Sequence, residues 1–182
     1  MGFLSRAKRE VAVVGHHAGM DNRDRDPTGR ARNARPRDAQ GRPLPHGSHG
    51  IDRCPEDVVL SPDDAVRQAQ RLIDDGCPFA AHEVFEGMWK ATSGAHRELW
   101  QGLAQLAVGL THVQRGNSKG AVTLLRRGAD RIDPYTAAPP HGLDVAGLAS
   151  HARSLAARIE RDGLGAAVGG LAPRLKAVSA SP

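Results

Sequence analysis

Residues 78–127, PFAAHEVFEGMWKATSGAHRELWQGLAQLAVGLTHVQRGNSKGAVTLLRR, decide the fold of this chain. They contain both tryptophans and two of the three phenylalanines in a sequence of 182 residues. Because aromatic residues make up only 3% of the chain, the rest of the core has to be built from leucine and alanine. We therefore expect the core to form around this stretch, with the remaining segments framing it.

Within this stretch, residues 95–116 are predicted to form a central helix. At 100° per residue their apolar side chains cover one broad face, which is typical of a helix surrounded by others. Gly102 and Gly109 lie in the same segment, and a glycine inside a helix costs roughly 1 kcal/mol relative to alanine. The two glycines predict that another backbone comes close to this helix. The apolar face consists of Leu99, Leu103, Leu106, Ala107, Leu110 and Val113, with Trp100 and Ala104 at its edge.

The preceding helix is predicted over residues 79–91, with Pro78 in its first turn, where the missing N–H does no harm. The connection formed by residues 92–94 is so short that the two helices have to be antiparallel neighbours. We therefore expect residues 79–91 to be the segment that packs against Gly102 and Gly109.

Polar side chains follow one flank of each of these two helices. His82 and Glu86 are one turn apart, and on the central helix three polar residues fall within about 40° of one another. If the two flanks meet, polar groups converge between apolar helices, which is the general form of a binding site. The candidate pocket consists of His82, Glu83, Glu86, Gln101, Gln105 and His112, with Trp89 and Trp100 as its walls.

The N-terminal third carries the charge excess of the protein. Residues 1–53 contain 11 basic and 6 acidic side chains, which accounts for the whole formal net charge of +5. Residues 21–60 are rich in arginine and proline and have no apolar period, so we expect an extended, largely irregular arm. Residues 1–20 are expected to be a disordered leader, or to precede a true start at Met20. The arginines expected to contact phosphates or a partner are Arg30, Arg32, Arg35, Arg37 and Arg42.

Two interpretations of the arm remain open. In the first, the arm binds an acidic belt, residues 56–86, which carry 8 acidic side chains and only two basic ones, Arg67 and Arg71. The belt would belong to the same chain or to a second subunit in a homo-oligomer. Alternatively the arm binds nucleic acid through its phosphates. No base-stacking aromatic residue accompanies the arginines, which weakens the interpretation as a binder of single strands.

The remaining segments complete an all-α, antiparallel bundle of five to six helices within residues 61–178. Ser61 is predicted to cap a helix that reaches residue 75, with proline at its first position. Gly116 and Asn117 form a helix junction, with Asn117 as the cap. Further helices are expected over residues 118–132, 143–161 and, more weakly because of its glycines, 164–178.

The cysteines and the apolar runs of the sequence indicate the cellular compartment of the protein. The two cysteines, Cys54 and Cys77, have no metal-ligand spacing and suggest a reducing environment. No apolar run approaches the 18 residues of a membrane-spanning helix, and the apolar segment near the N-terminus is too short for secretion. We therefore expect a cytoplasmic protein without membrane contact.

The runs AHEVFEGMWK and RELWQGLAQLAVGLTHVQRGNSKGAVTLLRRGADRI resemble the uncharacterised, all-helical bacterial family known as domain of unknown function 309. The shared pattern is Ala-His-Glu, a further Glu, Trp, Gln-Gly, a small apolar run, His, Gly-Asn, Gly-Ala and paired leucines, over about residues 62–132. The resemblance implies a helical bundle and no established activity. Its recurring positions correspond here to His82, Glu83, Glu86, Trp89, Gln101, His112 and Asn117.

Three functional hypotheses from different classes remain open. The first, which we favour, is an interaction module whose polar cluster fixes helix register and whose arm and grooves engage a partner. The second is an enzyme that uses His82, Glu86 and His112, either to hold a divalent metal or for acid and base catalysis. The third is a nucleic-acid accessory protein that acts through the arm. No serine or cysteine nucleophile is placed beside a base, and there is no glycine-rich phosphate loop.

Overall fold

Five α-helices follow one another in the computed structural model, which describes residues 35–50 and 60–177. No strand occurs in these residues, so the predicted all-α fold is confirmed. The helices are α1 (Pro62–Asp74), α2 (Pro78–Ala91), α3 (Arg97–Gln114), α4 (Ser118–Ile132) and α5 (Val145–Asp162). Three short 3₁₀ helices accompany them: η1 (Asp133–Tyr135), η2 (Pro140–Gly142) and η3 (Leu164–Gly170).

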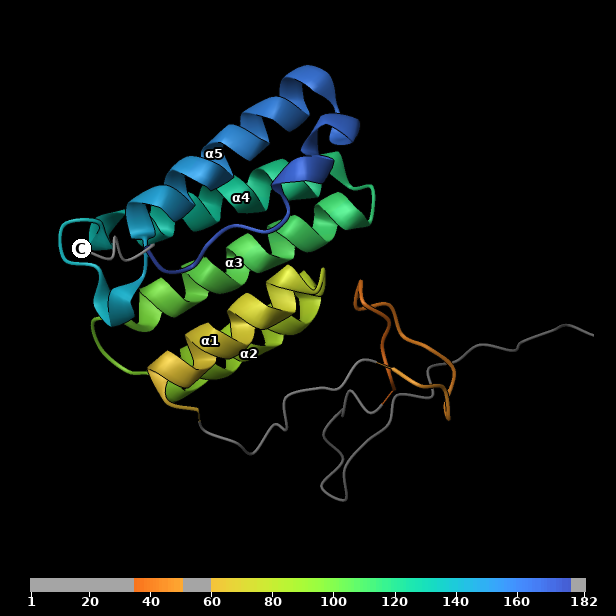
Figure 1. Ribbon diagram of the computed structural model, residues 1–182, viewed down its shortest axis with the longest axis horizontal. Coiled ribbons are helices and arrows are strands. Elements are labelled where there is room, and N and C mark those ends of the chain that lie inside the picture. Colours follow the sequence, from red (N-terminus) through yellow and green to blue (C-terminus); the bar gives the residue numbers. More distant parts are fainter. Residues whose placement is uncertain (1–34, 51–59, 178–182) are drawn as a thin grey trace, which may run out of the picture. The chain divides into compact units, whose positions relative to one another are not determined.

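Helices that follow one another in the sequence also lie next to one another in space. Figure 1 shows α3 in the middle of the bundle, with α2 and α1 on one side and α4 and α5 on the other. From α1 to α4, short connections force this order, because a few residues can only reverse the chain and return it along the preceding helix. The position of α3 agrees with the prediction of a central helix.

Three of the five α-helices, α1, α4 and α5, begin with a side-chain cap. Ser61 accepts a hydrogen bond from the backbone N–H of Asp64 at 3.2 Å, and Asn117 accepts one from Gly120 at 2.9 Å. Both caps were predicted, and each satisfies a backbone donor that the first turn of a helix leaves free. Asp144 caps α5 in the same way, through the N–H of Gly147 at 2.9 Å.

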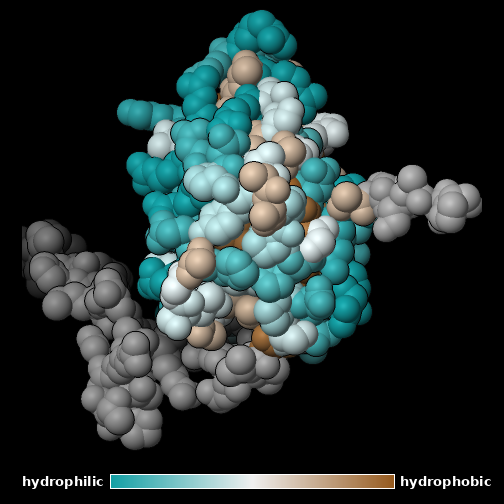
Figure 2. All heavy atoms as spheres, turned by 90° about the vertical axis from the view of Figure 1, so that its left-hand side faces the viewer, coloured by the Kyte–Doolittle hydropathy of each residue, from teal (hydrophilic) through white to brown (hydrophobic). Residues whose placement is uncertain are grey.

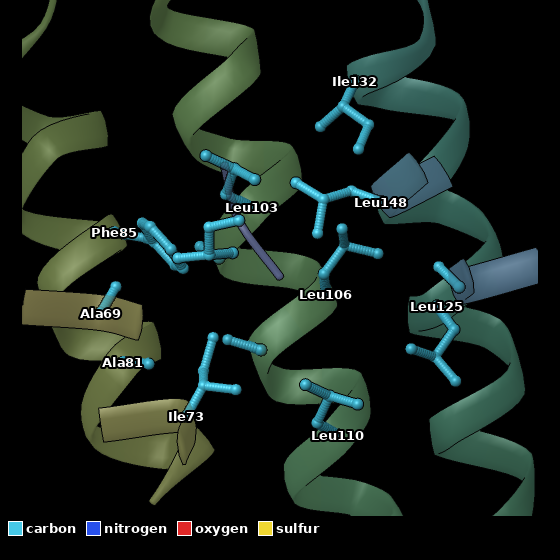
Figure 3. Packing of buried hydrophobic residues seen from close by; sticks show 14 of the residues in the cluster. Ala69, Ile73, Ala81, Phe85, Leu103, Leu106, Leu110, Leu125, Ile132 and Leu148 are labelled. Atoms are coloured by element: carbon cyan, nitrogen blue, oxygen red, sulfur yellow. The ribbon is translucent and has the colours of Figure 1, made fainter. Parts of the chain in front are cut away.

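Leucine and alanine side chains make up most of the buried core, as the composition predicts. Leu103, Leu106 and Leu110 of α3 lie between Phe85 of α2 and Leu125 of α4 (Figure 3). These five side chains are at most 8% exposed. In the view of Figure 2 the surface is mostly hydrophilic, and hydrophobic residues appear as scattered spots. The helices therefore bury most of their apolar faces against one another.

The glycines of α3 face α4, so the prediction that they receive α2 is wrong. A Cβ on Gly102 would lie 2.5 Å from Ile132 and 3.2 Å from the carbonyl oxygen of Gly128. A Cβ on Gly109 would lie 2.9 Å from Leu125. The spacing of seven residues correctly indicated a close backbone, but it carries no information on which neighbour supplies it.

The C-terminal segment departs from the sixth helix predicted over 164–178. Only η3 forms, and the chain then continues without regular structure to residue 177. Repeated glycines and Pro173 explain this, because glycine disfavours a helix and proline removes a donor from it. Gln70 of α1 holds the segment instead, donating to the Pro173 carbonyl at 3.2 Å and accepting from the N–H of Leu175 at 2.7 Å.

Within the predicted arm, residues 35–50 contain a tight turn. Asp38 accepts hydrogen bonds from the N–H groups of Gln40 and Arg42 at 3.0 and 2.8 Å, and Gly41 has a φ of 72°. A left-handed glycine that closes a short hairpin loop is a common arrangement. The predictions for residues 1–34 and 51–59 concern positions outside the described residues.

Candidate functional site

His82 and Glu86 face each other on α2, one turn apart. Their closest atoms, Nε2 and Oε2, are 3.7 Å apart, and the other carboxylate oxygen of Glu86 lies 3.0 Å from Nζ of Lys90. The histidine side chain is 22% exposed and the glutamate 35% exposed, so the pair lies at the edge of the bundle. Glu86 therefore has a positive partner at neutral pH, whether or not His82 is charged.

Burial favours the neutral form of the His82 imidazole. Burial lowers the pKa of His82 below its ordinary value, although Glu86 and Glu83 act in the opposite direction. The backbone carbonyl of Ala104 also favours the charged ring, which shows that the imidazole lies against α3. Nδ1 is buried and has no hydrogen-bond partner within the described residues.

The polar residues of α3 turn towards α4 as much as towards α2. Arg131 donates to the side-chain oxygen of Gln101 at 2.6 Å and forms an ion pair with Glu98. Gln105, one turn further along α3 than Gln101, has a buried side-chain oxygen without a partner in the described residues. The predicted polar stripe of α3 is therefore shared between its two neighbours.

His112 has a structural partner at the junction of α3 and α4. Its Nδ1 lies 2.9 Å from the side-chain nitrogen of Asn117, which also caps α4. Burial lowers the pKa of His112, and the positive charge of Arg115 lowers it further. This bond connects the last turn of one helix to the first turn of the next.

A metal site at His82, Glu86 and His112 gains no support from the geometry. In residues 35–50 and 60–177, no group of three or more histidine, cysteine, aspartate or glutamate side chains is arranged to hold a metal ion. The metal hypothesis therefore stays a prediction. Cys77, a free cysteine, has a pKa raised first by burial and then by Asp75, so its thiol is not activated as a nucleophile.

The two tryptophans have different environments. Trp100 is 1% exposed and packs against Phe85, with ring centroids 6.2 Å apart, so it belongs to the core. The ring of His141 also stacks on Trp100, with centroids 5.5 Å apart, and the backbone of His141 has a φ of 57°, in the left-handed region. Trp89 is half-buried, and the guanidinium of Arg97 lies 4.7 Å from the centre of its ring. The indole N–H of Trp89 has no partner among the described residues.

Four of the side chains with unpartnered buried atoms define what we call the α3 polar face. Trp89 Nε1 and Arg131 Nε are donors, Gln105 Oε1 is an acceptor, and His82 Nδ1 serves as either, depending on the tautomer. The set comes from α2, α3 and α4. A face that offers both donors and acceptors is suited to a neutral polar group such as a peptide amide.

Phe79 anchors the described part of the arm. The guanidinium groups of Arg37 and Arg115 lie 5.3 and 5.5 Å from the centre of its ring, and Arg115 also donates to the carbonyl of Gln40 at 2.7 Å. A Cβ on Gly41 would overlap the same ring. Arg35 and Arg42 are exposed, and the remaining arginines predicted to contact phosphates, Arg30 and Arg32, lie outside the described residues.

One wide hollow in the described residues was not predicted from the sequence. This α4 groove has a volume of about 1,210 Å³ and extends along α4 between Glu98 of α3 and Glu160 of α5. Sequence alone could not reveal the groove, because its second wall comes from α5, more than 30 residues further along the chain.

Comparison with known proteins agrees with the predicted resemblance. Residues 66–124 match the model of a family described as Domain of unknown function (DUF309). The similarity covers less than half of the chain, residues 66–124 of 182. No curated protein and no solved structure matches the chain.

The DUF309 match begins in α1 and ends inside α4. It includes His82, Trp89 and Gln105 of the α3 polar face, but it stops before Arg126 and Arg127 of the α4 groove. The matched segment is helical, and the description of the family gives no function. None of the helices in the described residues has the length and apolar character needed to cross a membrane.

Proposed function

We propose that this helical bundle is a binding module that holds a short segment of a partner protein across the α3 polar face. The observation that carries the proposal is the set of unpartnered buried atoms on His82, Trp89, Gln105 and Arg131. A buried polar atom without a partner costs about 1–3 kcal/mol, and folded proteins leave few of them. Four on one face are a reason to expect a binding partner there.

The chemistry of the four atoms selects the class of ligand. An anion would accept from Trp89 and Arg131 but would leave the Gln105 oxygen without a donor. A metal ion would not satisfy the indole N–H at all. A peptide backbone carries N–H and C=O groups in alternation, so it supplies both kinds of partner.

The dimensions suit a short peptide. Arg97, which covers Trp89, and Ala104, which faces His82, are seven residues apart on α3, or about 10 Å at the helical rise. An extended chain covers that distance with about three residues. Arg97 is exposed and lies over the indole of Trp89.

Nuclear magnetic resonance tests the proposal directly, because the full chain has only two tryptophans and therefore two indole N–H signals. The probe is an array of random eight-residue peptides. We expect binding peptides to shift the Trp89 signal and to leave that of Trp100, which is 1% exposed, unchanged. In a Gln105→Leu variant the Kd of these peptides should rise about tenfold, in line with the loss of one hydrogen bond.

Gln114→Leu is the matched control. Gln114 also has an unpartnered buried side-chain oxygen, but its nitrogen donates to the Gly76 carbonyl at 2.8 Å, away from the α3 polar face. Equal peptide affinity in Gln105→Leu and the unchanged protein would contradict the proposal. So would an array in which no peptide moves the Trp89 signal.

A further inference from the structure

The α4 groove follows α4 from Ser118 to Arg131, so it is about 20 Å long at 1.5 Å per residue. Its floor is apolar. Ile159 of α5 is 3% exposed, and Val122 and Tyr135 are partly buried against the core. The hydroxyl of Tyr135 donates to the Ala95 carbonyl at 2.5 Å, which fixes the ring in the wall of the groove.

The charges that line the groove do not cancel. Its three carboxylates are all engaged within the bundle, because Glu160 pairs with Arg126 at 2.5 Å, Glu98 with Arg131, and Asp130 with Arg153 at 3.0 Å. Lys119 and Arg127 also line the groove, and neither has an ion-pair partner in the part of the chain that the structure describes. Two exposed cations therefore stand beside an apolar floor.

This combination favours one kind of occupant. A polyanion such as nucleic acid would meet three carboxylates and would make no use of the apolar floor. A second copy of this chain would bring another cationic α4, and like charges repel. An amphipathic helix has an apolar stripe for the floor and charged flanks for the rim, and a helix of about 14 residues matches the length of the groove.

We propose that the α4 groove binds an amphipathic helix of a partner protein, with its apolar stripe on Val122 and Ile159 and with Asp or Glu side chains paired to Lys119 and Arg127. This surface shares only Arg131 with the α3 polar face, and it binds a different structure, a helix in place of an extended segment. The two proposals can be told apart, because one test changes Gln105 and the other changes Lys119 and Arg127, and none of these three residues belongs to both surfaces.

The test uses the full chain and two designed 14-residue peptides labelled with fluorescein. Both carry leucine at positions that form one helical stripe, and their flanks are either glutamate or lysine. Fluorescence anisotropy should give a Kd at least tenfold lower for the glutamate peptide. In the double variant Lys119→Glu/Arg127→Glu this preference should reverse, because the groove then carries acids opposite the peptide flanks.

Arg71→Glu is the matched control, since Arg71 is an exposed cation on α1, outside the groove. It should leave both affinities unchanged. Lys119 and Arg127 are exposed, and circular dichroism will confirm that the double variant is folded.

Equal affinity for the two peptides, absence of binding by either, or the same preference in the double variant would overturn the proposal. Light scattering and a titration with duplex DNA and RNA complete the test. Self-association that the double variant abolishes would assign the groove to a second copy. Nucleic-acid binding that the same variant abolishes would assign it to phosphates, and either result would also overturn the proposal.

Discussion

The two sides of α3 make contact with their neighbours in different ways. On the α4 side, Gly102 and Gly128 bring the backbones together, because a Cβ on either would lie 3.0–3.2 Å from the carbonyl oxygen of the other. On the α2 side, the rings of Phe85 and Trp100 fill the space between the helices, with centroids 6.2 Å apart. One contact depends on the absence of side chains and the other on the two largest ones. The comparison shows that one helix can pack closely against a neighbour through glycines on one side and through large aromatic side chains on the other.

The largest expected effect comes from emptying the α2 side. Phe85 is 1% exposed, and Phe85→Ala should lower the free energy of unfolding by about 3–5 kcal/mol, because it leaves a cavity that the backbone cannot close. Urea unfolding followed by circular dichroism measures the loss. Phe79→Ala is the control, since Phe79 is only partly buried and lies under the arm. An equal loss in both variants would show that the α2 side is not packed as described.

Filling the α4 side should have a smaller effect of the same sign. Gly102→Val places atoms against Ile132 and the Gly128 carbonyl and should cost about 1–3 kcal/mol through overpacking. The same unfolding measurement applies. Gly87→Ala on α2 is the matched control, because no atom lies within 4 Å of the added Cβ, and this variant should be more stable by about 0.5–1 kcal/mol. Stabilisation by both substitutions would refute the close approach of α3 and α4.

The junction between α3 and α4 should respond to Asn117 by about 1 kcal/mol. Asn117→Ala removes the cap on Gly120 and the contact with His112, and loss of such a cap costs about 0.5–2 kcal/mol. Asn117→Asp keeps an oxygen for the cap, so it should recover most of the stability. Thermal unfolding of the three proteins measures the difference. If the aspartate variant is as unstable as the alanine variant, the contact with His112 contributes more than the cap.

The smallest expected effect is the pH dependence of folding stability that His82 of α2 causes. Because burial lowers the pKa of His82 below 6.5, the unfolded chain takes up a proton at a higher pH than the folded chain. Stability should therefore be constant above about pH 6.5 and should fall below it, by less than about 1.4 kcal/mol per pH unit. His112 and His141 also have lowered pKa values, so the contribution of His82 is the difference between the unchanged protein and His82→Gln. Identical pH profiles would show that His82 does not titrate differently on folding.

Local signals in the sequence were reliable wherever neighbouring residues act on one another. Ser61 and Asn117 were recognised as caps because a cap acts on a backbone group only three residues away. The central position of α3 followed from the width of its apolar face. The prediction of a helix over 164–178 was wrong, because the glycines and Pro173 in this segment disfavour a helix. The segment forms hydrogen bonds with Gln70 instead.

The candidate site was only partly accessible to the same reasoning. The helical period correctly places Gln101 and Gln105 on one side of α3, but it cannot say that Arg131 reaches Gln101 from α4. The pairing of His112 with Asn117 removed one member from the expected cluster, and no pattern within α2 or α3 indicates this. The α4 groove could not be predicted at all, because α4 and α5 form it together.

The amino-acid sequence by itself determined the helical class, the order of the helices, their caps and the leucine and alanine core, because these depend on periodicity and on contacts within a few residues. Only the tertiary structure decided that the glycines of α3 receive α4, which polar atoms stay without partners, and where a groove opens. These features depend on the angle and depth at which helices pack, and that geometry results from all the side chains of the interface together.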